Sequence, residues 1–219
     1  MTGEYMKGDG FYDGLERVGI IPVIVLEKEN DATPMAKALV AGGLPAAEVT
    51  FRTPAAPGCI HEMATKCPDI LVGAGTVLNI AQAKRAVDAG AKFIVSPGFD
   101  VETVGWCLDN HVDVIPGGVT ATEITTLVSM GLDVTKYFPA NLFGGKKGID
   151  SLASVFVGHR FMPTGGVSLS NVEELVEDPA IIAVGGTWMV KAKFFADGDF
   201  SEVEKLASEA AAVVRKVRG

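Results

Sequence analysis

Short runs rich in β-branched residues alternate with amphipathic helical segments along nearly the whole chain. The unit recurs about every 20–25 residues, the spacing expected for a strand followed by a helix that leads back to the next strand. This alternation predicts parallel strands joined by right-handed crossovers. The predicted strands are Ile20–Leu26, Ala46–Arg52, Ile70–Gly73, Lys92–Ser96, Val112–Pro116, Asp133–Pro139, Arg160–Pro163 and Ile181–Gly185.

The segments between these strands carry apolar residues at helical spacing. Gly42, Gly90 and Gly131 follow three of them and are predicted to end helices, because glycine readily adopts the left-handed conformation found there. Residues 200–217 are predicted to form an amphipathic closing helix. The other predicted helices are Thr33–Ala41, Ala81–Ala89, Val101–Asp109 and Ala121–Met130.

These units predict a single-domain TIM-type (β/α)8 barrel over residues 1–219, with residues 1–10 as a polar, glycine-rich lead-in. The length of 219 residues is near the lower limit of about 200 for this fold. The alternative is an open doubly wound sheet, but no G-x-G-x-x-G follows the first strand. Glycine recurs where strands end, and these positions are predicted to be turns at the barrel mouth. They are Gly73–Thr76, Pro97–Gly98, Pro116–Gly118, Gly165–Gly166 and Gly185–Thr187.

The amino-acid composition limits the classes of partner and the cellular compartment that are expected for this chain. A net charge of −8 argues against nucleic acid or an anionic membrane as partner. No apolar run reaches membrane length, and no basic leader with an apolar stretch opens the chain. Cys59, Cys67 and Cys107 form no C-x-x-C motif, which favours a reducing cytoplasm over a disulfide framework or a zinc site.

Several other polar and aromatic residues give weaker signals. The three histidines show no metal-ligand spacing and are predicted to lie on the surface. Both tryptophans are predicted to pack, and Lys146–Lys147 to lie in a solvated loop. No metal or cofactor is therefore expected. The histidines are His61, His111 and His159, and the tryptophans are Trp106 and Trp188.

Lys136 lies in the short apolar run Val134–Ala140. Lysine is rare in buried strands unless it is paired or reactive. Burial generally lowers the pKa of a lysine, so that a free amine becomes available near neutral pH and can form a Schiff base with a carbonyl. The alternative is a surface lysine on an edge strand.

A second polar face accompanies this lysine. Glu48, Thr50 and Arg52 share one side of a predicted strand, because side chains alternate with period two. If this side and Lys136 both face the barrel lumen, an amine, a carboxylate and a guanidinium meet there. Glu48 would move protons and Arg52 would hold a substrate carboxylate. The alternative is a structural ion pair between Glu48 and Arg52.

Two glycine pairs lie where the last two predicted strands end. Gly165–Gly166 and Gly185–Gly186 would let backbone amides approach an anion closely, and the second pair precedes the hydroxyl of Thr187. Phosphate commonly binds at these two loops in such barrels. A phosphorylated small substrate is therefore predicted.

Taken together, these motifs resemble the 2-keto-3-deoxy-6-phosphogluconate (KDPG) aldolase family, also called 2-keto-4-hydroxyglutarate (KHG) aldolase. The resemblance runs in order from about Ile20 to the C-terminal helix. It rests on Pro22–Ile24, Glu48–Thr53, Val72–Leu78, Ser96–Gly98, Lys136–Ala140, Pro163–Gly166 and Gly185–Trp188.

The resemblance implies a class I aldolase on a (β/α)8 barrel that works without a metal, usually as a homotrimer. Lys136 matches the Schiff-base lysine, and Glu48 matches the general acid/base that acts through a water. The remaining matches are Arg52 and Thr76 for the pyruvate carboxylate, Pro97 and Phe138 for the pocket wall, Thr164 for the sugar-acid hydroxyls, and Gly165, Gly166, Gly185, Gly186 and Thr187 for phosphate.

The chain departs from the family pattern in two places. Asn141 stands where the family usually has glutamate, and bulky Leu142–Phe143 follow it. Thr187 replaces the usual serine but keeps the hydroxyl. Asn141 and Leu142–Phe143 alter the mouth and bear on the aldehyde half of the substrate, so a related sugar acid or a different aldehyde acceptor is an alternative.

The predicted function is a cytoplasmic lyase that cleaves a 2-keto-3-deoxy sugar acid 6-phosphate to pyruvate and glyceraldehyde 3-phosphate. Cleavage of 4-hydroxy-2-oxoglutarate to pyruvate and glyoxylate is a related expectation. Two alternatives are a sugar-phosphate isomerase or epimerase, which would use the glycine loops without an imine, and a non-catalytic relative.

Overall fold

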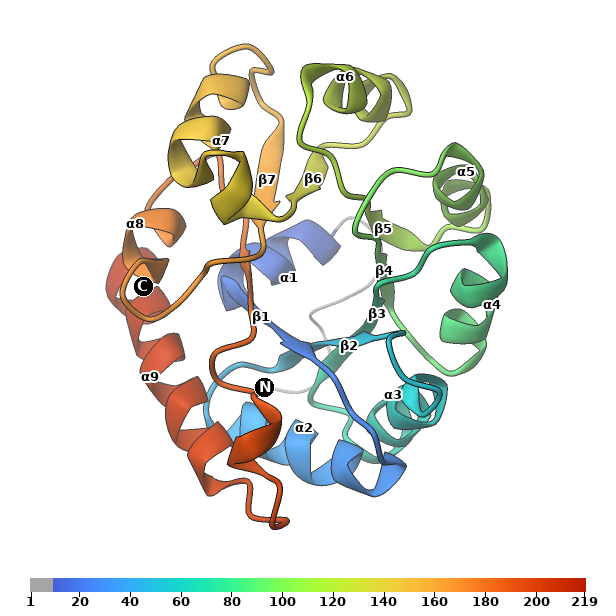
Figure 1. Cartoon of the computed structure of the whole chain (residues 1–219), viewed down its shortest axis with the longest axis vertical. Helices are drawn as coiled ribbons and strands as arrows, with labels where there is room; N and C mark the ends of the chain where they lie inside the picture. The colour runs from blue at the N-terminus through green and yellow to red at the C-terminus, as the bar shows by residue number, and fades with distance from the viewer. Residues whose placement is uncertain (1–9) are drawn as a thin grey trace.

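The computed structural model describes residues 10–219, in which eight strands lie inside a layer of helices (Figure 1). The strands lie close to the segments predicted from the sequence, because those segments combine β-branched residues with turn residues at both ends. They are β1 (Ile20–Ile24), β2 (Ala46–Thr50), β3 (Leu71–Gly75), β4 (Phe93–Val95), β5 (Asp113–Ile115), β6 (Val134–Tyr137), β7 (Arg160–Pro163) and β8 (Val184–Gly186).

Backbone hydrogen bonds join these strands into a closed barrel. Six strands pair in the order β5-β4-β3-β2-β1-β8, and β6 pairs with β7. Parallel bridges from Gly117 to Lys136, from Phe161 to Ile181 and from Thr164 to Gly185 connect the two groups. The first strand therefore lies beside the last, which an open doubly wound sheet does not allow. The prediction of a (β/α)8 barrel is confirmed.

Helices cover the outside of the barrel (Figure 1). Several begin where the sequence supplies a cap: Asn79 and Asp100 accept hydrogen bonds from helix amides, and Thr120 forms a capping box with Glu123. The helices are α2 (Ala32–Ala41), α3 (Ala56–Lys66), α4 (Ile80–Asp88), α5 (Val101–Asp109), α6 (Ala121–Ser129), α7 (Gly145–Ala153), α8 (Val172–Val176) and α9 (Ser201–Arg218), with 3-10 turns η2 (Glu29–Asp31), η3 (Ala140–Phe143) and η4 (Ala192–Phe194).

The glycines predicted to end helices do so with one adjustment. Gly90 and Gly131 have positive φ angles directly after α4 and α6 and their capping residues. Gly42 follows α2 with φ −71°, and the left-handed residue is its neighbour Gly43 with φ +83°. The reversal of the chain thus occurs one residue later than the sequence predicts.

Helix α1 (Phe11–Val18) was not predicted from the sequence, and it closes the amino end of the barrel. Phe11 is 2% exposed, and its ring centroid lies 5.4 Å from that of Phe93 on β4. Figure 1 shows α1 behind the strands. Of the predicted lead-in, residues 1–9 lie outside the described residues, and Gly10 is the N-cap of α1.

The apolar core fills the layer between the strands and the helices. Val49 is fully buried on the outer face of β2, whereas its neighbour Glu48 is fully buried on the face toward the lumen. This alternation places apolar side chains against helices and polar ones inside the barrel. In residues 10–219, no helix is both long enough and apolar enough to span a bilayer.

Candidate active site

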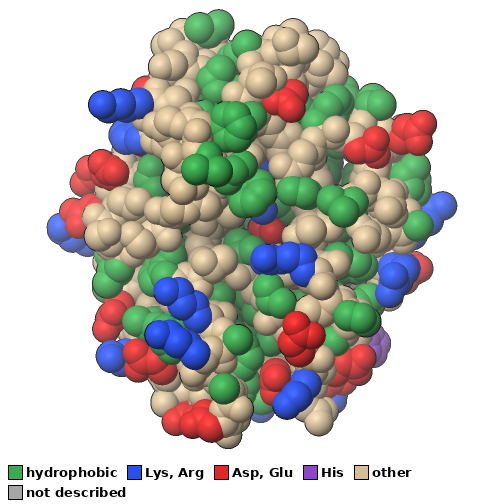
Figure 2. Space-filling model, in the orientation of Figure 1, with side chains coloured by type: hydrophobic (Ala, Val, Ile, Leu, Met, Phe, Trp, Pro, Cys, Tyr) green, Lys and Arg blue, Asp and Glu red, His purple; other side chains and the backbone are tan. Residues whose placement is uncertain are grey.

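A cavity of about 240 Å³ opens at the carboxyl ends of the strands. It lies on the face opposite α1, where Figure 2 shows apolar side chains gathered across the middle and upper part and charged ones mainly along the lower part and rim. All site residues predicted from the sequence line this cavity except Gly186. The lining residues are Val23, Glu48, Arg52, Thr76, Pro97, Lys136, Phe138, Thr164, Gly165, Gly166, Val167, Gly185 and Thr187.

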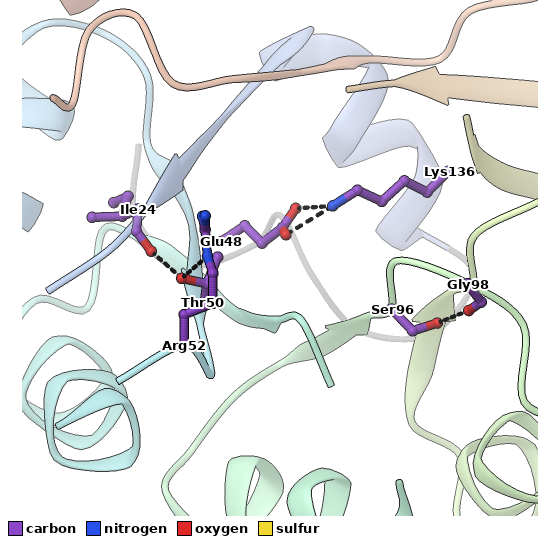
Figure 3. Close-up of polar contacts among 7 residues, drawn as sticks. All are labelled: Ile24, Glu48, Thr50, Arg52, Ser96, Gly98 and Lys136. Carbon is purple, nitrogen blue, oxygen red and sulfur yellow. Dashed lines mark hydrogen bonds and ion pairs between the residues drawn. The ribbon is translucent and has the colours of Figure 1, made fainter. Parts of the chain in front are cut away.

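The side chains of Lys136 and Glu48 both line this cavity and point toward each other (Figure 3). Lys136 Nζ on β6 lies 3.0 Å from Glu48 Oε1 and 3.4 Å from Oε2 on β2. The lysine side chain is 6% exposed and the carboxylate side chain is not exposed at all. The alternative of a surface lysine is therefore wrong. An amine and a carboxylate in hydrogen-bond contact can exchange a proton when a substrate carbonyl arrives.

Room for this carboxylate comes from a glycine on the next strand. A Cβ added at Gly75 would lie 2.1 Å from Glu48 Oε1, so no other residue fits beside Glu48 without a shift. Gly73 on the same strand makes room for the Phe93 ring in the same way. The prediction that these glycines form a turn at the mouth is wrong, because both lie within β3. They are needed for the space they leave.

Arg52 lies at the cavity rim and is not the partner of Glu48. Its Nε donates a hydrogen bond to Thr50 Oγ1 over 3.2 Å, and Thr50 Oγ1 donates to Ile24 O over 2.9 Å (Figure 3). Within residues 10–219, no carboxylate lies at ion-pair distance from Arg52. The alternative of a structural Glu48–Arg52 pair is thus wrong. The guanidinium stays available to an anion in the cavity.

Thr76 and Pro97 form the wall that follows β3 and β4. Thr76 has a φ of +56°, in the left-handed region that β-branched residues rarely occupy. Ser96 Oγ donates to Gly98 O over 2.7 Å and so holds the turn around Pro97 (Figure 3). Strain of this kind is kept where the surrounding structure demands it, often at functional sites.

Phe138 covers Lys136 from the mouth side. Its ring centroid lies 5.6 Å from Lys136 Nζ, and 37% of the residue is exposed. A cation over an aromatic face is favourable, and the ring also shields the ammonium from water. Phe138 thus lines the cavity wall, at the position that the sequence predicts for it.

The glycine loop after β7 forms the opposite wall. Gly165 and Gly166 have φ angles of +95° and +76°, which only glycine adopts easily. Thr164 is 5% exposed, and its Oγ1 has no hydrogen-bond partner within residues 10–219. Gly185 leaves space for this hydroxyl, since a Cβ there would lie 2.2 Å from Thr164 Oγ1. A buried hydroxyl without a partner can bind a hydroxyl of the substrate.

The second glycine pair differs from its prediction. Gly185 and Gly186 lie in β8 and have no positive φ, so they are strand residues and not a loop. Gly186 does not line the cavity, because a Cβ there would lie 2.1 Å from the Trp188 ring. Thr187 lines the cavity and is exposed.

Two surface predictions are wrong. His159 is 6% exposed, its Nε2 lies 2.7 Å from Thr135 Oγ1, and burial lowers the pKa of its ring. Lys146 lies in α7 and pairs with Asp150 and Asp178, which raise the pKa of its amine. Sequence alone did not indicate either environment, because Thr135 and Asp178 come from other segments of the chain and only Asp150 lies in the same helix as Lys146.

Val23 and Val167 line the cavity but were not predicted. Val23 lies in β1, where every residue is buried, so its lumen-facing position gives no polar signal. Val167 directly follows the Gly165–Gly166 pair, and that adjacency is the signal that would have found it.

A larger cavity of about 470 Å³ lies elsewhere, between α1, α8 and the end of α9. Its most buried cation, Arg218, donates hydrogen bonds of 2.8 Å to four backbone carbonyls. The donors of that arginine are thus used within the fold, where they tie the end of α9 to neighbouring backbone.

Comparisons with known proteins agree with this geometry. A family model described as KDPG and KHG aldolase matches residues 13–206. The 2-dehydro-3-deoxy-phosphogluconate aldolase of Treponema pallidum (strain Nichols) is 46% identical over 203 residues, which cover 93% of this chain and 97% of the relative. The KHG/KDPG aldolase of Escherichia coli (strain K12) is 40% identical over 191 residues, covering 87% and 90%.

A solved structure is also similar. The KDPG aldolase of Legionella pneumophila, with pyruvate captured at low pH as a covalent carbinolamine intermediate, has a TM-score of 0.86 and 35% identity. The match covers 90% of this chain and 96% of that one. The likeness thus extends over nearly the whole of both proteins.

Proposed function

Because the chain belongs to the KDPG and KHG aldolase family, we propose that it is a class I aldolase with Lys136 as its Schiff-base residue. Its substrate is a 2-keto-3-deoxy-6-phosphogluconate-like acid, cleaved to pyruvate and glyceraldehyde 3-phosphate. The observation that carries the proposal is the buried contact of 3.0 Å between Lys136 Nζ and Glu48 Oε1.

In the proposed reaction Lys136 first passes a proton to Glu48 and attacks the C2 carbonyl as a free amine. The carbinolamine loses water with a proton from Glu48 and becomes a protonated imine. Glu48, directly or through a water, then removes the proton of the C4 hydroxyl. The C3–C4 bond breaks, its electrons move into the imine, and glyceraldehyde 3-phosphate leaves. Glu48 protonates the enamine at C3, and hydrolysis releases pyruvate and the amine.

The remaining lining residues hold the substrate in this orientation. The unpaired guanidinium of Arg52, with Thr76, binds the carboxylate of the pyruvate half. Thr164 binds a hydroxyl of the sugar acid, and Pro97 and Phe138 form the walls. Gly165, Gly166, Gly185 and Thr187 bind the phosphate at the other end.

Residues at the rim of the cavity determine which aldehyde half of the substrate fits. Asn141, Leu142 and Phe143 form η3 beside the cavity, and Leu142 is 75% exposed. We propose cleavage of 4-hydroxy-2-oxoglutarate to pyruvate and glyoxylate as a second activity, because its pyruvate half is the same. Pyruvate release from the gluconate- and galactonate-derived phosphates and from 4-hydroxy-2-oxoglutarate ranks the substrates.

Borohydride reduction in the presence of pyruvate tests the proposal. The expected result is one reduced pyruvate on the peptide that carries Lys136, and none in Lys136→Met. Lys147→Met is the matched control, because Lys147 is exposed and lies outside the cavity. A chain that cleaves the substrate while Lys136 stays unmodified would contradict the imine and favour another sugar-phosphate reaction.

We also propose that residues 1–219 act as one domain, that the chain assembles as a homotrimer and that it works in the cytoplasm. Exposed apolar residues such as Val155 and Val157 supply area for contacts between copies, and all three cysteines are free and buried. Sedimentation equilibrium of the purified chain measures the assembly state; a monomer would contradict the trimer.

A further inference from the structure

The glycine loop after β7 is held from behind by three successive hydrogen bonds. Ala140 N donates to Thr164 O over 2.8 Å, and Asn141 N donates to Gly165 O over 3.3 Å. The third donor is a side chain: Asn171 Nδ2 donates to Gly166 O over 2.9 Å. Three consecutive carbonyls of the loop are thus occupied by groups outside the cavity.

These carbonyls determine where the amides point. A trans peptide is planar, so its N–H points opposite to its C=O. When Asn171 binds Gly166 O, the N–H of Val167 points to the other side of the loop. The strip from Gly165 to Val167 separates the catalytic cavity from a second cavity of about 160 Å³, and Asn171 lines only the second one. The Val167 N–H is therefore directed toward the catalytic cavity.

This N–H has no acceptor within residues 10–219, and neither has that of Gly166. Successive free amides in a loop with positive φ angles make a concave site for an anion. Glycine peptides rotate at little cost, so the loop needs an external contact to keep its amides facing inward. A rotated Gly166–Val167 peptide would present a carbonyl oxygen to the phosphate.

The side-chain amide of Asn171 can satisfy its two contacts with the backbone in one orientation only. Its Oδ1 accepts from Ser168 N over 2.8 Å while its Nδ2 donates to Gly166 O. A backbone N–H requires an acceptor and a carbonyl requires a donor, so exchanging oxygen and nitrogen would break both bonds. Aspartate has the acceptor but lacks the donor, and alanine lacks both.

We infer that Asn171 is a positioning residue that fixes the inward direction of the Val167 amide and thereby sets the affinity for the phosphate end of the substrate. The neighbouring Gly166 amide is held in the same way by the contact of Asn141 N with Gly165 O. The inference rests on the proposed function, since it concerns the phosphate end of that site. Asn171 does not line the catalytic cavity and does not touch the reacting atoms.

The test compares a phosphorylated substrate with the same sugar acid lacking its phosphate. In Asn171→Ala, kcat/KM for the phosphorylated acid is expected to fall about threefold to tenfold through KM, the size of one lost hydrogen bond. For the unphosphorylated acid, kcat/KM changes less than twofold. The inhibition constant for inorganic phosphate rises by the same factor as KM for the phosphorylated acid. In Asn171→Asp, kcat/KM for the phosphorylated acid falls at least as far, because the second carboxylate oxygen faces Gly166 O and repels it.

Pyruvate trapping by borohydride counts the folded sites and probes the other end of the cavity. The pyruvate concentration for half-maximal trapping stays unchanged in both variants. Asn110→Ala is the matched control, because Asn110 Nδ2 also donates to a backbone carbonyl, Trp106 O, over 2.8 Å at a helix end outside the cavity. Asn110→Ala is expected to lower kcat/KM for neither acid.

Two results would overturn the inference: an unchanged ratio between the two acids in both Asn171 variants, or an equal loss for both acids per trapped site. Failure of the proposed function looks different. In that case the unmodified chain itself traps no pyruvate and cleaves neither acid.

Discussion

One wall of the cavity is built from side chains, and the other is built from backbone groups. On one wall, side chains from β2 and β6 meet, and Lys136 and Glu48 form a buried ion pair. On the other wall, the loop Thr164–Val167 presents backbone groups whose direction is set by contacts from behind. In the proposed function, the first wall supplies the nucleophile and the proton carrier, and the second supplies an uncharged site for the phosphate.

The two walls are sensitive to different kinds of substitution. A side-chain wall depends on the identity of two residues and on the space left for them. A backbone wall depends on conformation, so residues that never touch the substrate control it. Variants on the first wall should therefore change kcat and trapping, and variants on the second should change KM for phosphorylated acids.

Lys136→Met breaks the first wall most completely. Activity is expected to fall by more than about 10⁴-fold, because loss of a covalent nucleophile removes the imine route. The variant should also lose about 3 kcal/mol of unfolding free energy, since Glu48 stays buried without its partner. Initial rates and urea unfolding measure the two effects.

A double variant, Glu48→Gln with Lys136→Met, separates these effects. Stability should recover because no lone carboxylate remains buried, while activity stays absent. Recovery of activity in the double variant would contradict the role of both residues.

Gly75→Ala tests whether space for Glu48 matters as much as the residue itself. The added Cβ would lie 2.1 Å from Glu48 Oε1 and displace the carboxylate from the amine. A displacement of about 1 Å costs about 100-fold in kcat. Gly105→Ala is the control, because nothing lies within 4 Å of its Cβ. Equal rates for the two variants would show that Glu48 needs no fixed place.

Gly166→Ala acts on the second wall. Its Cβ would lie 2.5 Å from Asn141 Cβ at a φ of +76°, so the loop must shift. KM for the phosphorylated acid is expected to rise about tenfold, with pyruvate trapping unchanged, as the strain of about 1–2 kcal/mol is relieved by moving the amides. Gly158 has a similar φ of +86° with nothing within 4 Å of an added Cβ, so Gly158→Ala serves as the control. A rise for Gly158→Ala as well would assign the effect to general strain.

Thr164→Val removes a hydroxyl that has no partner within residues 10–219. Stability should stay the same or increase slightly, while kcat/KM for the sugar acid falls about fivefold because one hydrogen bond to substrate is lost. Thr50→Val is the contrasting control, since Thr50 Oγ1 binds both Ile24 O and Arg52 Nε. Thermal unfolding and steady-state rates measure both. A loss of stability in Thr164→Val would show that the hydroxyl serves the fold.

The smallest effect concerns the outer face of β6, where His159 contacts Thr135. Burial lowers the pKa of His159, so the native state prefers the neutral ring. Its stability contribution is complete above the unfolded pKa of about 6.5 and is lost as the pH falls below that value toward the lowered native pKa. Urea unfolding at pH 7.5, 6.5 and 5.5 should show a weaker decline in His159→Gln. Identical declines in stability for the two proteins would show that His159 is not their cause. At each pH, pyruvate trapping at Lys136 should be the same in His159→Gln as in the unmodified chain.

Much of the barrel was predictable because each strand and helix is encoded locally. Helix α5 was predicted with its observed bounds, Val101–Asp109, since Asp100 caps it and the next strand follows closely. Helix α1 was missed, because only its position under the barrel explains why Phe11 and Leu15 are buried. Gly75 looked like a turn residue, and its use as space for Glu48 depends on a neighbouring strand.

The alternation of residue types along each strand could be read from the sequence, and it indicated which polar groups face the lumen. The closed barrel was needed to show that Glu48 pairs with Lys136 and not with Arg52, that His159 is buried and that Asn171 reaches Gly166 O. The physical reason is distance along the chain: periodicity is a property of neighbouring residues, whereas the partners of a buried group come from segments that only the closed barrel brings together.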